Sequence, residues 1–590
     1  MSEVMPISET IYVENSFSGR RWALAQCDED LARGIQLDHQ IPAVIARLLA
    51  SRGVARDAAM DYLNPTLKHL LPEPRTLAHM DEAVARVVKA ILAREKIAVF
   101  GDYDVDGSCS AALMAGFLAA VLEPPRTYIP DRLTEGYGPN SAALLKLKAE
   151  GISLVITVDC GAGAQVALQT AREAGLDVIV LDHHASEHAV PALVQVNPNA
   201  GGDGSGLGHL CAAGITFLFL VALNRALREA GHYTSRPEPN LMEAVDLVGL
   251  ATVCDVVPLT GVNRAFVRAG LARLGRLERP GIKALAHIAD VAPPFTPYTL
   301  GFVFGPRINA GGRVGRCGLG VDLLTTHDAA AAEEHALALD THNRERQAIE
   351  KMILDEATAL AAQQEASPFI LVAGEGWHPG VVGIVAGRLK ERFNKPAFVA
   401  GFEGGLGRGS ARSVLGINVG AMVRAAHENG VIESGGGHAM AAGFGLTPAQ
   451  VEPFRVFLLE AFAKGGPVAD VPLAIDATVS PGGATISLAR DLQLAGPYGA
   501  GNAEPLLVIP DARVAFADVV GKGHVRLRLV GGDGARLDAI AFRVAETPLG
   551  DALLKSRGSQ IQVAGRLRAE EWNGQARVQL HLDDAAPVSS

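Results

Sequence analysis

Three short apolar runs, each followed by an aspartate, place the strongest constraint on how this chain can fold. The runs and the first aspartate after each are residues 97–100 with Asp102, residues 154–158 with Asp159, and residues 178–181 with Asp182. Runs of this length and composition are typical of strands buried on both faces. A helical pattern at residues 80–92 precedes the first run, and helical patterns at 141–150 and 165–174 lie between the runs. The alternation predicts an α/β fold with a parallel sheet covered by helices.

The length of 590 residues indicates three or four domains, at ~150 residues each. A polar segment with apolar residues spaced by four, four and three predicts a long connecting helix. After about residue 470 the sequence pattern changes to short alternating strands with a GGDG turn, which is typical of a small barrel of OB type. We therefore expect a helical extension at 1–75, a catalytic α/β domain at 76–339, the connecting helix at 340–366, a smaller α/β domain at 367–465, and the barrel at 470–590.

The aspartates at the strand ends predict a metal site. In an open parallel sheet the carboxyl ends of the strands line one crevice. Carboxylates gathered there would repel one another, and the sequence supplies too few nearby cations to neutralise them, so a divalent ion is expected. A carboxylate-rich set with one or two imidazoles suits Mn²⁺ or Mg²⁺ better than zinc. Enough bridging carboxylates would hold two ions and activate water for attack on phosphorus.

Each of these elements has a simpler reading when it is taken alone. An aspartate after a strand often caps the next helix or sits in a turn. The adjacent histidines His183 and His184 could serve a surface or capping role. Asp255 follows a helical run rather than a strand. Four such elements in order make coincidence a poor explanation, and together they predict a metal centre.

Eight motifs between residues 101 and 443 match a known family. They are GDYDVDG (101–107), PDRLTEGYG (130–138), VDCG (158–161), LDHH (181–184), TVCDVVPLTGVNR (252–264), GPRINAGGR (305–313), GSARS (409–413) and GGGHAMAAG (435–443). At these residues the sequence resembles the DHH phosphoesterase family, named for the tripeptide at 182–184. The resemblance is closest to members that degrade single-stranded DNA from its 5′ end. It implies a DHH domain and a smaller DHHA1-type domain that face each other across a cleft, followed by an OB domain.

The resemblance also implies roles for the acidic and histidine residues. The implied metal ligands are Asp104, Asp106, Asp159, His183 and Asp255. Asp102 lies close behind them, and Asp159 would bridge two ions. His184 would face the metal or the scissile phosphate, so Asp102, Asp159 and His184 are the expected catalytic groups. Asp182 is expected to organise its loop rather than bind metal.

The family motifs further imply residues that hold the DNA. Arginine forks and glycine-flanked loops suit phosphate oxygens, so Arg132, Ser410 and Arg412 are expected to bind the 5′-terminal phosphate. Arg307, Asn309 and His438 are further candidates in the cleft. An ordinary surface arginine at 132 and a core histidine at 438 are the simpler alternatives.

Two weaker signals concern the path of the strand. Arg388, Lys390, Arg392 and Lys395 form a basic run that is either a solvated helix face or a patch that tracks the DNA backbone. The barrel offers few aromatic residues for base stacking, and the obvious ones are Phe516, Phe542 and Trp572. We expect the barrel to contribute weakly, through charge and shape.

Composition limits the remaining choices. A net charge of −11 argues against a general nucleic-acid coat protein, although it allows a local basic groove. The six cysteines are scattered and form no CxxC pair, so neither a zinc knuckle nor a disulfide framework is expected. No apolar stretch reaches the ~18 residues of a membrane span, and no signal peptide is visible. We expect a cytoplasmic, monomeric protein.

The resulting hypothesis is a single-stranded-DNA-specific 5′→3′ exonuclease that releases 5′-mononucleotides by two-metal hydrolysis. The family's role in recombination and repair implies a helicase and a single-strand-binding protein as partners. One alternative is another DHH enzyme that hydrolyses oligoribonucleotides, cyclic dinucleotides or pyrophosphate; such enzymes tend to lack the terminal barrel. The other is a catalytically inactive DHH replication scaffold, which would be expected to lack ligand aspartates that this sequence retains.

Overall fold

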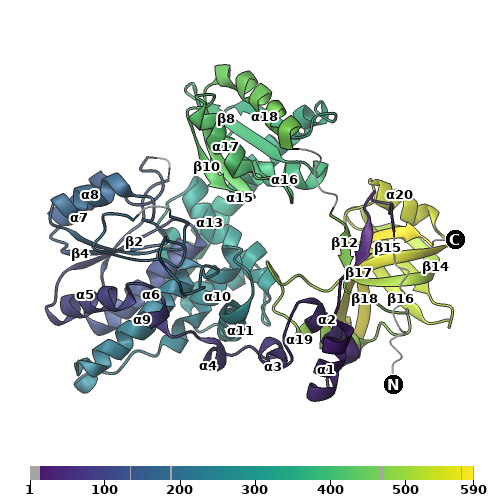
Figure 1. The fold of residues 1–590 in the computed structure, drawn as a ribbon, viewed down its shortest axis with the longest axis horizontal. Helices are drawn as coiled ribbons and strands as arrows, with labels where there is room; N and C mark the ends of the chain where they lie inside the picture. Colours follow the sequence, from purple (N-terminus) through teal and green to yellow (C-terminus); the bar gives the residue numbers. More distant parts are fainter. Residues whose placement is uncertain (1–12, 133, 187–188, 466–470, 573–574, 589–590) are drawn as a thin grey trace.

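The computed structural model describes residues 13–132, 134–186, 189–465, 471–572 and 575–588. Three bodies make up the chain (Figure 1): a large α/β unit (residues 74–328), a small α/β unit (residues 369–465), and a barrel unit in which residues 13–63 join residues 473–587. The α/β fold class with a parallel sheet, a second α/β body and a closed C-terminal barrel, expected from the sequence, is confirmed.

The large unit is built on a five-stranded parallel sheet of order β3-β2-β4-β5-β6. Its strands are β2 (Ile97–Gly101), β3 (Arg126–Tyr128), β4 (Leu154–Val158), β5 (Asp177–Leu181) and β6 (Val194–Val196). Register aligns Gly101 with Val158 and Val158 with Leu181, so the three central strands end at one level. The residues that follow them therefore share one edge of the sheet.

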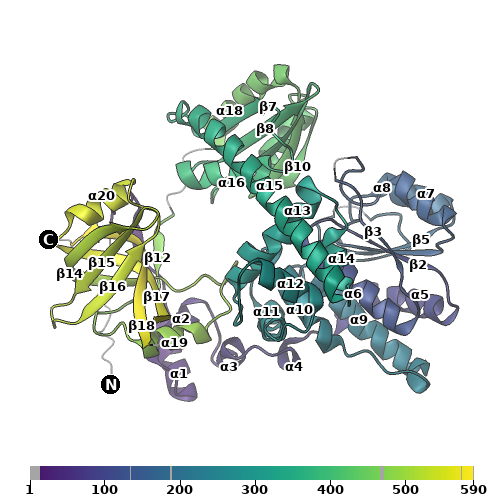
Figure 2. The ribbon, with the colours of Figure 1, turned by 180° about the vertical axis from the view of Figure 1, so that it is seen from behind.

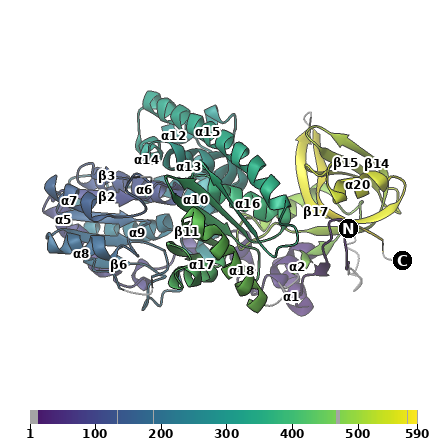
Figure 3. The ribbon, with the colours of Figure 1, turned by 90° about the horizontal axis from the view of Figure 1, so that it is seen from above.

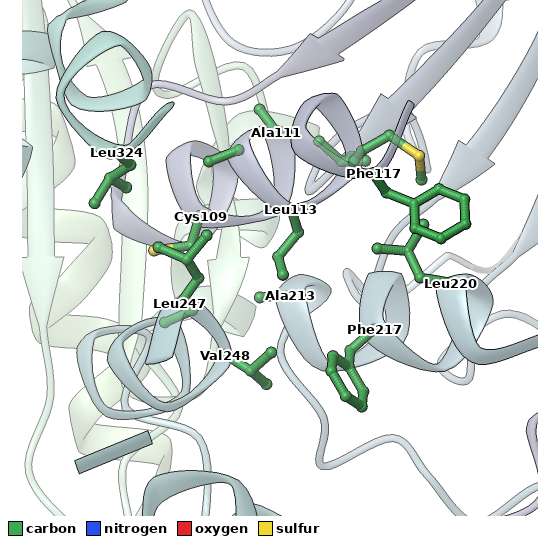
Figure 4. Close-up of a cluster of buried hydrophobic side chains, with 14 of the residues drawn as sticks. Cys109, Ala111, Leu113, Phe117, Ala213, Phe217, Leu220, Leu247, Val248 and Leu324 are labelled. Atoms are coloured by element: carbon green, nitrogen blue, oxygen red, sulfur yellow. The ribbon is translucent and has the colours of Figure 1, made fainter. Parts of the chain in front are cut away.

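Helices cover both faces of this sheet because its central strands are apolar throughout. Figure 1 shows α7 (Ser141–Ala149) and α8 (Gln165–Glu173) on one face, and α5 (Met80–Leu92), α6 (Val105–Val121) and α9 (Ala212–Glu229) on the other. Helix α6 is buried on almost every side. Figure 4 shows its Cys109, Leu113 and Phe117 packed among residues of α9 and α10 (Val245–Cys254). This packing fixes the N-terminus of α6 against the sheet edge.

A helical layer completes the large unit. It comprises α10, α11 (Gly261–Leu274), α12 (Pro280–Ile288), the π-helix η4 (Thr299–Phe304), α13 (Gly305–Val314) and α14 (Leu319–Thr325). Helices α10 and α11 cross at two glycines: a Cβ on Gly249 would lie 2.9 Å from Cα of Gly270. Larger side chains would separate the two helices and move the end of α10, where Asp255 sits.

A single helix of 34 residues, α15 (Ala329–Ala362), joins the large and small units (Figure 2). Its first half packs on α12 and α13, and its second half on α16 (Val382–Phe393). The sequence predicted this helix at 340–366. It begins earlier because the Asp328 carboxylate caps the backbone N–H of Ala331 and alanines favour the first turn.

The small unit is a mixed sheet of order β10-β11-β9-β8-β7. The strands are β7 (Ile370–Glu375), β8 (Ala397–Glu403), β9 (Leu406–Arg412), β10 (Ser434–His438) and β11 (Ala441–Leu446), packed with α16, α17 (Val419–Glu428) and α18 (Val451–Gly465). Seen from above, this unit lies over the helical layer of the large unit (Figure 3). Its strand β9 carries Ser410 and Arg412.

The barrel closes through pairing of β14 (Leu507–Val520) with β17 (Gln560–Trp572). Between them lie β15 (His524–Val530), β16 (Arg536–Ala541) and β18 (Gln575–Pro587), with helices α19 (Ile486–Leu494) and α20 (Pro548–Lys555) alongside. The short strand β13 (Ala477–Thr478) pairs with the start of β14.

The N-terminal segment joins the barrel. Strand β1 (Trp22–Leu24) pairs in parallel with β12 (Leu473–Ile475), and the indole N–H of Trp22 donates to the buried Asp584 carboxylate at 2.9 Å. Helices α1 (Glu29–His39), α2 (Ala43–Ser51) and α3 (Ala59–Leu63) share a core with the barrel strands, while α4 (Leu67–Leu70) leads to the large unit. The sequence described this segment only as an extension.

Among the residues that the structure describes, no helix is both long enough and apolar enough to cross a membrane.

Candidate metal centre and interdomain cleft

The loop between β2 and α6 supplies the first three carboxylates. Asp102 follows the last residue of β2, Asp104 caps α6 by accepting from the N–H of Gly107 at 2.9 Å, and Asp106 lies in the first turn of α6. A Cβ on Gly107 would lie 2.6 Å from the carbonyl oxygen of Asp102, so glycine is required for the loop to fold this tightly. The Asp106 carboxylate also accepts from the N–H groups of Ala212 and Ala213 at the start of α9.

Asp159 follows β4 with its backbone in the left-handed region, at φ +60°. A non-glycine residue in this region is uncommon and points to a constraint at the site. The Asp159 side chain is buried, and its Oδ1 lies 3.3 Å from Nε2 of His183.

His183 lies between carboxylates from three different elements. Besides Asp159, its Nε2 lies 3.9 Å from Oδ2 of Asp106, and its Nδ1 lies 3.7 Å from Oδ2 of Asp255. Asp255 follows the last residue of α10, where the helix dipole disfavours a negative charge. The carboxylate therefore occupies a place that a nearby cation would make favourable.

The structure brings all the expected ligands together. Three overlapping sets have ligand atoms within 4.8 Å of one another: Asp102, Asp104 and Asp159; Asp159, His183 and His184; and Asp106, His183 and Asp255. Buried carboxylate oxygens in this cluster lack hydrogen-bond partners, namely Oδ1 of Asp102, Oδ1 of Asp159 and Oδ2 of Asp255. Unpaired buried oxygens are costly unless a ligand satisfies them, so the donor set fits hard divalent cations such as Mn²⁺ or Mg²⁺.

The protonation equilibria of the cluster lead to the same conclusion. Burial, followed by repulsion from neighbouring carboxylates, raises the pKa of Asp102 and Asp159 well above the usual range and that of Asp255 to about 9. The pKa of Asp106 is raised too, chiefly by burial. Without a cation Asp255 would hold its proton at neutral pH; a divalent ion would displace it.

Asp182 has a different environment from the other aspartates. Its carboxylate accepts from the backbone N–H groups of Ala162, His183 and His184 and contacts Nδ1 of His184 at 2.7 Å. Although burial opposes it, these donors lower the pKa of Asp182. This geometry is that of a residue that organises the loop.

His184 lies at the edge of the cluster and contacts Tyr137. The Tyr137 hydroxyl donates to the carbonyl oxygen of Asp159 at 3.1 Å and lies 3.2 Å from Nδ1 of His184. Burial lowers the pKa of His184, but the Asp182 carboxylate outweighs it and raises the pKa to about 9. The motif that contains Tyr137 was recognised from the sequence, but this residue was not singled out. The glycines on either side of it were the available signal, and the structure places both at positive φ.

Arginines from both α/β units lie near one another: Arg132 and Arg412 both act on the pKa of Arg313, and Arg132 acts on that of Asp102. Arg132 lies over the ring of Tyr103, with its guanidinium carbon 5.3 Å from the centroid. In the small unit, Arg412 donates to Oγ of Ser410 at 2.8 Å. A Cβ on Gly383, in the first turn of α16, would lie 3.1 Å from both Arg412 Nη2 and Ser410 Oγ. Arginine, serine and a helix N-terminus together suit a phosphate.

Arg313 of α13 contacts the small unit and was not singled out from the sequence. Its Nη1 donates to the carbonyl oxygen of Gly380 at 2.9 Å, which ties the large unit to the small one. Burial, with the nearby charges of Arg132 and Arg346, lowers the pKa of Arg313 to about 10. Arg313 follows Asn309 by four residues, so both side chains lie on one face of the helix. This spacing was the signal that the sequence offered for Arg313.

The other three expected DNA-binding residues have different surroundings. Arg307 donates to Oδ1 of the buried Asp340 at 2.9 Å and to the carbonyl oxygen of Val303. Oδ1 of Asn309 is buried without a hydrogen-bond partner. His438 is exposed at the end of β10, where Ala441 pairs with both His438 and Arg412. Contact of these residues with DNA stays a prediction.

Contacts within the protein partly explain the basic run at 388–395 and the aromatic residues of the barrel. Arg388 pairs with Glu350 and Glu391, and Lys395 donates to the carbonyl oxygens of Glu365 and Ser367. In the barrel, Phe516 lies between Arg526 and Arg557. Phe542 lies between His524 and His581. The side chain of Trp572 lies outside the described residues.

Comparison with protein families finds three matching models in the order expected. They are the DHH family N-terminal domain at residues 96–252, the DHHA1 domain at 366–464, and the RecJ OB domain at 475–584.

Curated relatives match over nearly the full chain. The single-stranded-DNA-specific exonuclease RecJ of Bacillus subtilis is 33% identical over 579 residues, covering 96% of this chain and 71% of that protein. The protein of the same name from Escherichia coli is 34% identical, covering 94% of this chain and 97% of that protein. Among solved structures, RecJ from Thermus thermophilus in complex with Mn²⁺ matches with a TM-score of 0.81 and 30% identity, over 96% of this chain and 80% of that one. The same protein solved with Mg²⁺ matches with a TM-score of 0.73 at 28% identity, over 96% of this chain and 78% of that one.

Proposed function

This chain belongs to the RecJ family of single-stranded-DNA-specific exonucleases, and we propose on that premise that it hydrolyses single-stranded DNA from the 5′ end and releases 5′-mononucleotides. The observation that carries the proposal is the buried carboxylate–histidine cluster, together with the arginine–serine pair Arg412 and Ser410 of the small unit, which would suit a phosphate. The cluster supports hydrolysis, and the arginines support recognition of a phosphorylated end.

The cofactor we propose is a pair of Mn²⁺ or Mg²⁺ ions, held by Asp104, Asp106, Asp159, His183 and Asp255. Both metals were found with the Thermus relative. When bound, the ions would activate the attacking water and neutralise charge on the phosphoryl group.

The chain's own residues carry the rest of the mechanism. Water attacks the first internucleotide phosphorus, the bond to the 3′ oxygen breaks, and the next nucleotide keeps its phosphate. Asp102, with Oδ1 free of protein partners, would take the proton from water. Protonated His184, held by Asp182, would stabilise charge on the phosphate and the leaving oxygen. Each cut creates a new 5′-phosphate, so Arg132, Ser410 and Arg412 would serve every cycle.

Selectivity for single strands would follow from the cleft. Arg313 joins the large unit to Gly380 of the small unit beside the cluster, and a duplex would have to break this contact. Our proposal includes a monomeric cytoplasmic enzyme that acts with a helicase and a single-strand-binding protein, as the role of the family in recombination and repair supports.

The test is digestion of a 5′-phosphorylated single-stranded oligodeoxynucleotide with Mn²⁺. Wild type should release mononucleotides from the 5′ end and leave a blunt duplex intact, while Asp159→Ala should be inactive. Asp551→Ala, an exposed aspartate of α20, is the matched control and should behave as wild type. Persistence of the full-length strand, or faster hydrolysis of an oligoribonucleotide or cyclic dinucleotide, would refute the proposal.

A further inference from the structure

Val256 has a strained backbone conformation directly beside the carboxylate cluster. It follows Asp255 at the end of α10 and lies in the left-handed region, at φ +59°. Glycine is the usual residue at this position after a helix, and a β-branched residue is an outlier there. The Val256 side chain is 69% exposed, so packing does not explain its conformation. Such strain persists only where the surrounding structure holds the turn in place.

The side chain of Asn263, in the first turn of α11, holds this turn. Its Nδ2 donates to the carbonyl oxygen of Pro258 at 3.0 Å, three residues beyond Asp255. The same nitrogen donates to the carbonyl oxygen of His209 at 2.7 Å. Asn263 is 0% exposed, and its helix α11 packs against α10 (Figure 1). One buried amide nitrogen therefore joins two segments that are distant in the sequence.

The segment of His209 leads to a second expected metal ligand. His209 lies three residues before the start of α9, and the first two N–H groups of α9 donate to the Asp106 carboxylate at 2.6 and 2.8 Å. Asp106 and Asp255 belong to one ligand set, with His183 between them. Asn263 thus connects the backbone supports of two carboxylates that would share one ion.

The surroundings of Asn263 do not maximise stability. Its Oδ1 is buried without a hydrogen-bond partner, which is unfavourable for a polar atom. The left-handed Val256 is a second unfavourable feature of the same connection. Local features that oppose stability are expected where a site requires a defined geometry.

We propose that Asn263 is a positioning residue of the metal centre. By holding the carbonyl oxygens of His209 and Pro258 on one nitrogen, it fixes the separation of the Asp106 and Asp255 carboxylates. Hydrogen bonds that orient ligands from outside the coordination sphere contribute strongly to metal affinity. Without this donor the strained turn relaxes and carries Asp255 away from its partner ligands. The inference rests on the proposed function, which supplies the ligands and the ions.

Mn²⁺ binding in the absence of DNA tests this inference. Titration of the protein, followed by the electron paramagnetic resonance signal of free Mn²⁺, gives the number of bound ions and their affinities. Wild type should bind two ions. Asn263→Ala should bind one of them with wild-type affinity and the ion at Asp255 about 10- to 100-fold more weakly. Asn263→Ser is the milder variant and should lie between, because its shorter side chain reaches at most one of the two carbonyl oxygens.

The metal dependence of digestion provides a second measurement. The Mn²⁺ concentration that gives half the maximal rate should rise in Asn263→Ala by about the same 10- to 100-fold. The rate at saturating Mn²⁺ should change much less, because high metal concentration refills the weakened position.

A second buried asparagine distinguishes this effect from a general loss of stability. Asn224 of α9 is 6% exposed, and its side chain donates to Glu238 and accepts from the hydroxyl of Tyr233. It lies about three turns along α9 from the N–H groups that hold Asp106. Asn224→Ala should lower the unfolding temperature and still bind both ions with wild-type affinity.

Glycine at position 256 provides a rescue that depends on the strained turn. Glycine adopts the left-handed region without a steric cost, so the turn no longer needs Asn263 to hold it. Adding Val256→Gly to Asn263→Ala should strengthen the weakened Mn²⁺ site by about tenfold. A role of Asn263 in stability alone predicts no such recovery.

Three results would overturn the inference. They are wild-type affinity for both ions in Asn263→Ala, an equal loss of affinity in Asn224→Ala, and no recovery with Val256→Gly. The first would indicate that the Leu259–Ala500 hydrogen bond is sufficient to hold the turn. A wild-type chain that binds two Mn²⁺ ions but leaves DNA intact would refute the proposed function and not this inference.

Discussion

Nδ1 of His184 lies 2.7 Å from Oδ1 of Asp182, and this one carboxylate also accepts from three backbone N–H groups of the surrounding loops. The pair explains why one aspartate of the cluster has a lowered pKa while its neighbours have raised ones. It also keeps His184 protonated at neutral pH, with a pKa of about 9.

Replacing Asp182 by asparagine should therefore affect the pH dependence of catalysis. Loss of the negative charge should lower the pKa of His184 toward its ordinary value, so the alkaline limb of kcat should move to lower pH. At neutral pH we expect kcat to fall by about 10- to 100-fold, as for other residues that orient metal-site groups. Rates between pH 6 and 10 measure this. An alkaline limb at the wild-type position would show that Asp182 does not control His184.

Stability of the metal-free protein should decrease as pH rises. Asp255 has a folded-state pKa of about 9, above its unfolded value, because of burial and then the nearby Asp106 and Asp104. Its contribution is fully present below the unfolded pKa and is lost as pH rises through about 9. His184, which also has a raised pKa, acts in the same direction.

Mn²⁺ should reverse this trend, because ligands must lose protons to bind it. We expect Mn²⁺ to raise the unfolding temperature more at pH 8 than at pH 6, and Asp255→Asn to reduce the difference. Thermal unfolding in EDTA and in Mn²⁺ across this range measures both effects. A stabilisation by Mn²⁺ that does not depend on pH would contradict the assignment of the carboxylates as ligands.

The 5′-phosphate site predicts a specific kinetic signature for Arg412. Arg412→Ala should reduce the preference for 5′-phosphorylated over 5′-hydroxyl DNA by roughly 10-fold or more, since charge-assisted hydrogen bonds contribute ~1.5–3 kcal/mol. Arg412→Lys should recover only part of it, because an ammonium lacks the planar fork. The measurement is kcat/KM on matched oligonucleotides. An unchanged ratio would place the terminal phosphate elsewhere.

Much of this site is local in sequence, and that part was predictable. The strands at 97–100 and 154–158 were visible as apolar runs because both faces of a parallel sheet are buried. Aspartates placed after such strands had to meet at one sheet edge. Asp255 was included as the fourth acidic element although it follows a helix and not a strand, so its place beside the others did not follow from the sheet.

Long-range pairings could not be predicted in the same way. Pairing of β1 with β12 joins segments about 450 residues apart, and nothing in the N-terminal periodicity indicates a partner. The ion pair of Arg307 with Asp340 is equally hidden, because a sequence shows a charge and not its neighbour. Arg307 was read as a DNA-binding residue, and the structure shows a stabilising contact that the sequence did not predict.

This ion pair should be measurable as stability. Asp340 is 2% exposed, accepts from Arg307 and forms an ion pair with Arg344 of its own helix, so the Arg307 contact connects α13 to α15. Asp340→Ala leaves Arg307 without its partner and should lower the free energy of unfolding by about 3 kcal/mol. Urea denaturation measures the loss, with Glu334→Ala, an exposed residue of the same helix, as control. Equal stability of the two variants would contradict this account.

Arg264 should be a second determinant of stability, because it fastens the barrel unit to the large unit. Its buried guanidinium lies 3.8 Å from the ring centroid of Tyr62, and Nη2 donates to the carbonyl oxygens of Tyr62, Ala495 and Gly496. Tyr62 belongs to α3 of the N-terminal segment, and Ala495 and Gly496 directly follow α19 of the barrel unit. Arg264→Met keeps the volume and removes the donors, so we expect a loss of about 2–3 kcal/mol.

The loss of stability in Arg264→Met should be visible locally as well as in the unfolding of the whole chain. Limited proteolysis should cleave Arg264→Met near residues 495–502 faster than wild type, because this segment loses its attachment to the large unit. Arg276→Met, an exposed arginine just beyond the same helix α11, should be cleaved like wild type. If Arg264→Met unfolds at the wild-type urea concentration and resists protease equally, the two units are held together by other contacts, such as the Leu259–Ala500 hydrogen bond, instead.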